Sequence, residues 1–318
     1  MTAVYITLGI IAFILILCIA IGAYGFKLGC VSQRVKKPET DPVRIKRNEL
    51  RKINNDYLYS LNPEDLSIVT PDSLTLRAWF APAEKQTKRF VIAVHGHNCN
   101  GPDECSHILK FFRNELGWNY FLPDLRGHGR SDGKYIGFGA PDSKDIVQWI
   151  NYLVDRFGED IEIVLYGISM GAATVMLVNA QNPPKQVKLV IEDCGYTNAF
   201  EECANTVKDV IGFKVDPLLY FSNFYCKMLV KYDLKKDADP LGKMKNAKNP
   251  VLFIHGSGDT FVPFPMQQRL YDACPTPKDI LVIPDAVHAF SYYDGKAEYE
   301  AKIKQFVSAQ LGEAMITK

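Results

Sequence analysis

The longest apolar run in the chain covers residues 4–26, VYITLGIIAFILILCIAIGAYGF, and contains no charged side chain. At about 1.5 Å per helical residue, this run is long enough to cross a hydrocarbon layer of about 30 Å. The alternative is a cleaved secretory signal, but such signals begin with basic residues and have a shorter apolar core. The pattern therefore predicts that residues 1–30 form a single-pass membrane anchor.

Basic side chains flank this run on one side only. No Lys or Arg precedes it, and those that follow it are Lys27, Arg34, Lys36, Lys37, Arg44, Lys46 and Arg47. Because positively charged flanks tend to stay in the cytoplasm, the asymmetry predicts that the catalytic domain lies on the cytoplasmic side of the membrane.

Residues 31–60 form a basic juxtamembrane segment. Its apolar side chains Val43, Leu50, Ile53 and Tyr57 recur at helical spacing. We expect a linker helix here, lying near the membrane or against the domain that follows.

Short apolar runs rich in β-forming residues alternate with helical patterns through residues 61–318. The first two runs, LSIVT and LTLRAWF, are separated by the turn PDS and predict a hairpin. The later runs are FVIAVH, NYFLP, EIVLYG, VKLVIED, PVLFIHG and ILVIP. Nearly continuous apolar strands alternating with helices predict an α/β domain with a mostly parallel central sheet flanked by helices on both faces.

One connection interrupts this alternation, because residues 197–248 separate two predicted strands where a single helix would suffice. The insertion contains DPLLYFSNFYCKMLVKYDL, which is rich in aromatic and aliphatic side chains. We expect a small helical cap, whose apolar residues form either its own core or the wall of a substrate pocket.

Charge and cysteine content exclude some classes of function. The chain has 37 basic and 36 acidic residues, whereas nucleic-acid binding usually requires a clear basic excess. Its eight cysteines include no CxxC pair and no Cys/His ligand pattern, so we expect reduced structural thiols and no metal. If the domain lay outside the cytoplasm, a disulfide such as Cys99 with Cys105 would become possible.

The pentapeptide GISMG, residues 167–171, lies between the strand pattern EIVLY and the helical pattern MGAATVMLVNA. Glycine and serine are common turn residues, so the pentapeptide alone is weak evidence. Between a strand and a helix, however, Gly167 and Gly171 permit a sharp, strained turn that exposes the hydroxyl of Ser169. We therefore expect Ser169 to be a nucleophile.

A serine hydroxyl requires a base, and the chain offers the histidines His95, His97, His107, His128, His255 and His288. In this topology the acid and then the histidine follow the serine, which excludes the first four. His255 directly precedes a glycine at a strand end, whereas His288 lies in PDAVHAF, just after the last predicted strand. We expect His288 to be the base, with a surface-loop histidine as the alternative.

The acid that orients the histidine should follow a strand between these two positions. Asp259, in HGSGDTFVP, meets this requirement and would fix the histidine tautomer. Glu192 and Asp193 end the preceding strand, and Asp285 lies close to His288 in sequence. We favour Asp259.

Two amides are needed to bind the oxyanion that forms on a carbonyl oxygen, one after the nucleophile and one in the loop after an early strand. Met170 follows Ser169 and supplies the first. In VIAVHGHNCNG the amide of His97 is placed to supply the second.

The region from about residue 61 to the end resembles an α/β-hydrolase fold enzyme. The segments HG, DLRGHGRSDG, GISMG, HGSGDTFVP and VHAF occur in the order typical of the serine aminopeptidase and monoacylglycerol lipase-like branch, more narrowly its membrane-anchored bacterial members. The resemblance implies a triad of Ser169, Asp259 and His288, with an oxyanion hole formed by His97 and Met170. It also implies bracing rather than reacting roles for Asp124, Arg126, His128 and Ser131.

Together these observations predict a serine hydrolase that cleaves a carboxylic ester of a small-molecule or lipid-like acyl substrate and needs no cofactor. Amidase, peptidase or thioesterase activity on the same residues is the alternative. A further alternative is a membrane-tethered binding protein that retains an idle triad.

Overall fold

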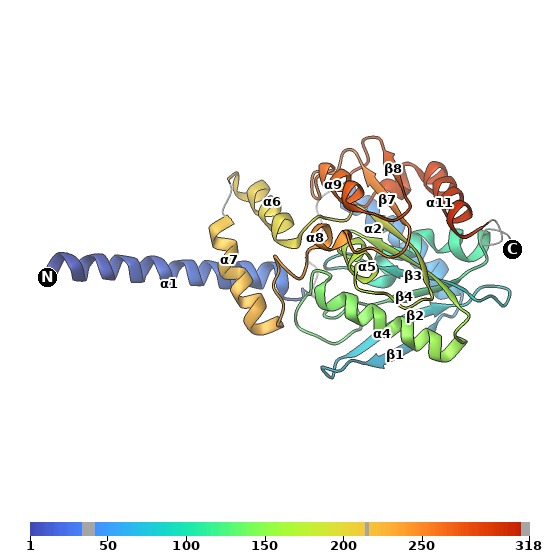
Figure 1. The fold of residues 1–318 in the computed structure, drawn as a ribbon, viewed down its shortest axis with the longest axis horizontal. Helices are drawn as coiled ribbons and strands as arrows, with labels where there is room; N and C mark the ends of the chain where they lie inside the picture. The colour runs from blue at the N-terminus through green and yellow to red at the C-terminus, as the bar shows by residue number, and fades with distance from the viewer. Residues whose placement is uncertain (34–41, 214–215, 313–318) are drawn as a thin grey trace.

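The computed structural model describes residues 1–33, 42–213 and 216–312 (Figure 1). Its centre is one sheet with the strand order β1-β2-β4-β3-β5-β6-β7-β8. The strands are β1 Glu64–Val69, β2 Thr75–Ala81, β3 Arg89–Val94, β4 Asn119–Pro123, β5 Glu162–Ile168, β6 Val187–Asp193, β7 Val251–Gly256 and β8 Lys278–Ile283. β1 and β2 form an antiparallel hairpin, β2 is antiparallel to β4, and the strands from β4 to β8 are parallel. The mostly parallel sheet and all eight strands agree with the sequence prediction.

Helices cover both faces of this sheet, because side chains of its buried strands point alternately to the two sides. In β3, Phe90 and Ile92 join a core beneath α4 Ala140–Phe157, α5 Met170–Ala180 and α9 Pro265–Ala273. Val91 and Ala93 join the opposite core, beneath α11 Lys296–Leu311. The shorter elements of the domain are α3 Gly101–Cys105, η1 Ser106–Ile108, η2 Phe111–Glu115 and α10 Ser291–Asp294.

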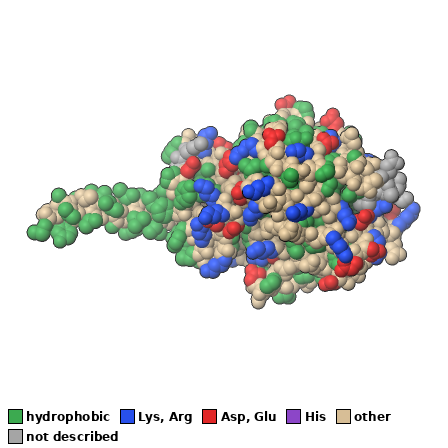
Figure 2. All heavy atoms as spheres, in the orientation of Figure 1, with side chains coloured by type: hydrophobic (Ala, Val, Ile, Leu, Met, Phe, Trp, Pro, Cys, Tyr) green, Lys and Arg blue, Asp and Glu red, His purple; other side chains and the backbone are tan. Residues whose placement is uncertain are grey.

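The N-terminal helix α1, Thr2–Cys30, projects from the domain and is apolar along almost its whole free length (Figures 1 and 2). Among the described residues it is the one helix long and apolar enough to span a membrane. Only its last turns are covered, since Gly22, Phe26 and Cys30 are buried.

The second helix, α2 Pro42–Ser60, packs against the domain. Leu58 is fully buried, and Arg51 forms an ion pair of 3.0 Å with Glu104. The predicted helix is present, with Leu50 and Tyr57 partly buried and Ile53 61% exposed. Three of the basic residues on which the topology prediction depends, Arg34, Lys36 and Lys37, lie outside the described residues.

Helical segments occupy the chain between β6 and β7, where the sequence predicts a cap. They are α6 Ala199–Ile211, α7 Asp216–Tyr225, η3 Cys226–Val230 and α8 Pro240–Met244. α7 lies beside the end of α1, at the junction between the projecting helix and the domain (Figure 1). All eight cysteines are free, including Cys99 and Cys105.

Candidate active site

Ser169 occupies a tight turn between the end of β5 and the start of α5. Its backbone has φ 56° and ψ −117°, a conformation that L-residues rarely adopt. A Cβ on Gly167 would collide with the backbone of Gly171, and a Cβ on Gly171 would collide with the carbonyl of Val94. The two glycines are therefore required for α5 to approach the sheet this closely, and the turn carries the backbone strain that functional sites often store.

The structure brings Ser169, His288 and Asp259 together at the carboxyl ends of the parallel strands. His288 Nε2 lies 3.0 Å from Ser169 Oγ, and His288 Nδ1 lies 2.7 Å from Asp259 Oδ2. Because an ionised carboxylate only accepts, Nδ1 carries the hydrogen and Nε2 is left to accept from the serine hydroxyl. This is the geometry that general-base activation of a serine requires.

The carboxylate of Asp259 is buried and held from several sides. Its Oδ1 accepts from the amides of Phe261 and Val262, each at 3.0 Å. Burial acts to raise the pKa of Asp259, but hydrogen bonds from His255 and His288 outweigh it and lower the pKa to about 2. The group is therefore an anion at neutral pH, suited to orienting an imidazole.

Two backbone amides lie beside the serine without an acceptor. Met170 is the first residue of α5, and His97 follows Gly96, whose added Cβ would lie 3.3 Å from Ser169 Cβ. Within the part of the chain that the structure describes, neither amide donates a hydrogen bond. The start of a helix and its free amides favour negative charge at this position.

The comparisons with known proteins agree with this architecture. Residues 85–196 match the model of the serine aminopeptidase family, S33. An esterase from Pyrococcus furiosus superposes with a TM-score of 0.67 at 21% identity, over 89% of this chain and 98% of its own. The chain has the α/β-hydrolase fold.

Relatives of this chain occur in bacteria and in yeast. An uncharacterised protein of Bacillus subtilis is 27% identical over 71% of this chain and 73% of its own length. An uncharacterised membrane protein of Saccharomyces cerevisiae is 26% identical over 71% of this chain and 73% of its own length. This chain likewise carries one apolar helix, α1, long enough to span a membrane. Its membrane anchoring and the side on which its domain lies stay predictions.

His255 is a site residue that sequence reasoning missed. We considered it only as a base, yet its buried Nε2 lies 3.0 Å from the carbonyl of Val262 and 3.3 Å from Asp259 Oδ2. A carbonyl only accepts, so Nε2 carries a hydrogen and a second imidazole contacts the acid. The sequence signal that could have identified it was its position at the end of β7, four residues before Asp259.

The rival acid Asp193 is engaged elsewhere in the fold. Its Oδ2 accepts from the hydroxyl of Tyr299 at 2.8 Å, and burial raises its pKa to about 6. No hydrogen bond joins it to His288 among the described residues, which favours Asp259 on geometry.

The residues of DLRGHGRSDG hold the loops around the site. Asp124 accepts from the amide of Gly101 at 2.9 Å and from the amide of Arg130 at 3.0 Å. His128 Nε2 accepts from the amide of Asn98 at 3.1 Å, directly after His97. These contacts agree with the bracing role expected from the resemblance.

One group of potential metal ligands occurs in the described part of the chain. Atoms of Cys194, Asp259 and His288 lie within 4.8 Å of one another. A cation there would displace the hydrogen bond between Asp259 and His288, so the donor set does not fit an ion alongside the serine geometry. The absence of a cofactor stays a prediction.

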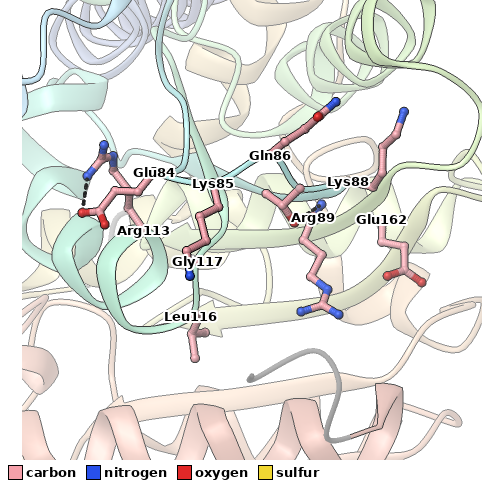
Figure 3. A pocket seen from close by; sticks show the side chains of 10 residues that line it. Glu84, Lys85, Gln86, Lys88, Arg89, Arg113, Leu116, Gly117 and Glu162 are labelled. Atoms are coloured by element: carbon pink, nitrogen blue, oxygen red, sulfur yellow. Dashed lines mark hydrogen bonds and ion pairs between the residues drawn. The ribbon is translucent and has the colours of Figure 1, made fainter. Parts of the chain in front are cut away.

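The domain also has a hollow of about 560 Å³ far from these residues in the fold. Arg89 begins β3 and Glu162 begins β5, so the hollow lies at the amino ends of strands whose carboxyl ends reach the serine (Figure 3). Its lining is mainly charged, including Lys85, Lys88 and Arg113. It offers no hydrogen-bonded nucleophile and base.

Proposed function

We propose that this chain is a serine hydrolase that cleaves a carboxylic ester through an acyl-enzyme. The observation that carries the proposal is the continuous hydrogen-bonded chain from Ser169 through His288 to Asp259, with distances of 3.0 and 2.7 Å. A buried, anionic Asp259 and two free amides beside the serine support it.

In this mechanism His288 removes the proton of Ser169 as its Oγ attacks the carbonyl carbon. The amides of His97 and Met170 stabilise the oxyanion, and His288 returns the proton to the departing alkoxide. His288 then takes a proton from water as the water attacks the acyl-enzyme, and it passes this proton to Ser169 Oγ as the acid leaves. Each step uses a contact or donor position described above.

Cleavage of amides or thioesters would use the same residues. The match to the serine aminopeptidase family favours a peptidase as the second candidate. Comparing short esters with matched amides and thioesters separates these candidates; we expect the ester to give the highest kcat/KM, and a higher value for the amide would overturn the choice.

A fluorophosphonate probe tests whether the site is active or idle. We expect labelling of the full chain at Ser169, loss of labelling in Ser169→Ala and His288→Ala, and retention in Ser308→Ala, a serine on α11 that serves as the control. Labelling that persists in Ser169→Ala would contradict the proposal, and a folded wild-type chain that does not label would favour a binding protein.

We further propose lipid-like or medium-chain acyl esters as the substrate class, because the cap carries exposed apolar side chains. These are Ile211, Phe213, Tyr220, Phe224, Met228 and Leu229. Ile19 of α1 and Tyr220, Phe221 and Phe224 of α7 together line an apolar groove. Residues 2–21 would cover about 30 Å of hydrocarbon as a helix, so the groove would lie near the membrane surface.

A panel of esters of increasing chain length, assayed with the full chain in detergent and in vesicles, tests this substrate class. We expect kcat/KM to rise with chain length in both, with a further gain in vesicles if substrate arrives through the bilayer. Highest activity on acetyl or aromatic esters, unchanged by vesicles, would favour small soluble substrates instead.

A further inference from the structure

The end of α1 is packed into the hydrolase domain as well as joined to it. Ser222 Oγ of α7 donates to the carbonyl of Gly22 at 3.0 Å, and an added Cβ on Gly22 would collide with Phe221. The ring of Phe26 lies 5.9 Å from that of Tyr225. The last turns of α1 therefore have a fixed position against the cap.

The chain directly after α1 joins the domain by backbone hydrogen bonds. The amide of Ile136 donates to the carbonyl of Cys30 at 2.8 Å, and the amide of Ser32 donates to the carbonyl of Lys134 at 2.9 Å. Val31 forms an isolated antiparallel bridge with Tyr135. Such pairing fixes the register between the end of α1 and this loop.

The side chain of His97 completes this connection. Its Nε2 lies 2.8 Å from the carbonyl of Gly29, and because a carbonyl only accepts, Nε2 is the donor. Gly29 belongs to the last turn of α1, whose carbonyls lack partners within the helix. The imidazole ring also packs on the ring of Phe138, with centroids 5.2 Å apart.

We infer that the last turn of α1 is a positioning element of the active site: the Gly29 carbonyl holds the His97 side chain, and with it the amide that faces the oxyanion. This inference rests on the proposed function and adds a role for the anchor beyond tethering. A shift of α1 would move an oxyanion donor while leaving Ser169, His288 and Asp259 in place. Loss of one oxyanion donor costs about 10²–10³ in kcat, and we expect partial misplacement to cost about tenfold.

Two glycines of α1 provide a matched pair of variants in the full chain. In Gly22→Ala the new methyl group meets Phe221, including its backbone, so α1 and α7 must move apart. In Gly9→Ala the methyl group meets nothing within 4 Å, so the same substitution in the same helix is a control. We expect kcat on a short p-nitrophenyl ester to fall about tenfold in Gly22→Ala with little change in KM, and both constants to stay unchanged in Gly9→Ala.

Variants of His97 test the hydrogen bond itself and do not depend on how Gly22→Ala folds. His97→Gln keeps a side-chain N–H donor, whereas His97→Leu has none. We expect the His97→Gln variant to retain most of its kcat, and kcat to fall about tenfold in the His97→Leu variant. Affinity for a trifluoromethyl ketone, which forms an oxyanion on the enzyme, should fall in parallel with kcat.

Equal kcat and ketone affinity in the Gln and Leu variants would overturn the inference, as would a folded Gly22→Ala variant with normal kcat. Ser169→Ala keeps this result separate from the proposed function. If Ser169→Ala loses turnover while the His97 and Gly22 variants remain normal, the inference alone fails; if Ser169→Ala remains active, the proposed function fails.

Discussion

The two ends of the central sheet place charged and polar side chains in opposite environments. At the carboxyl end Asp259 is 4% exposed and hydrogen-bonded on both oxygens. At the amino end the ion pair of Lys88 with Asp160 has side chains 48% and 69% exposed, beside the 560 Å³ hollow. Burial fixes the orientation and ionisation of the first group, whereas water screens the second. The size of a hollow is therefore a poorer guide to chemistry in this molecule than the burial of its polar groups.

Ser169→Ala should give the largest effect at the carboxyl end. Without the hydroxyl no acyl-enzyme forms, so kcat on a p-nitrophenyl ester should fall by about 10⁶, as it does when a serine nucleophile is removed elsewhere. Circular dichroism and the melting temperature check that the fold is intact. Near-normal turnover in Ser169→Ala would mean that the reaction does not depend on the carboxyl end of the sheet.

Asp259→Asn should give the second largest effect. The amide would favour the wrong tautomer of His288, so kcat should fall by about 10⁴ while substrate binding is retained. Steady-state kinetics with Asp193→Asn as the matched variant check the assignment. If Asp193→Asn loses activity and Asp259→Asn does not, the acid belongs to β6.

Glu202→Gln should change stability rather than chemistry. Burial raises the pKa of this cap residue to about 8, so the folded state keeps its proton while the unfolded chain ionises from about pH 4.5 upward. Native stability is thus lost as the pH rises between these values, and Gln removes that loss. We expect denaturant unfolding to show a gain on the order of 3 kcal/mol at pH 7. The gain should be absent at pH 4, and a pH-independent difference would argue against this origin.

Lys88→Ala at the amino end should give the smallest effect. Its ion pair with Asp160 is 3.1 Å long but exposed, so the melting temperature should shift by no more than about 1 °C and kcat should not change. A tenfold loss of kcat in this variant would mean that the charged hollow takes part in the reaction.

Sequence patterns predicted the parts of the molecule that depend on neighbours in the chain. The eight strands followed from apolar runs, and the turn at Ser169 followed from glycines two residues away on either side. The positions of Asp259 and His288 followed from the strands that precede them. These residues meet because the carboxyl ends of parallel strands share one edge.

The remaining features depend on contacts between distant segments and left no local pattern. The packing of Gly22 on Phe221 and the bond from His97 to Gly29 join segments that only the folded chain brings together. Ile53 followed helical spacing but is exposed, because the domain contacts α2 on a face that includes Leu58. Periodicity identifies a helix more reliably than it identifies which side is covered.

The contact between Gly22 and Ser222 also imposes an order on biosynthesis. The two residues are separated by 200 positions, and at about 5–20 residues per second a ribosome needs about 10–40 s to travel between them. During that interval Gly22 lacks its partner from the cap. The cap must therefore dock onto a helix that was made long before it, which makes this docking a late step in folding.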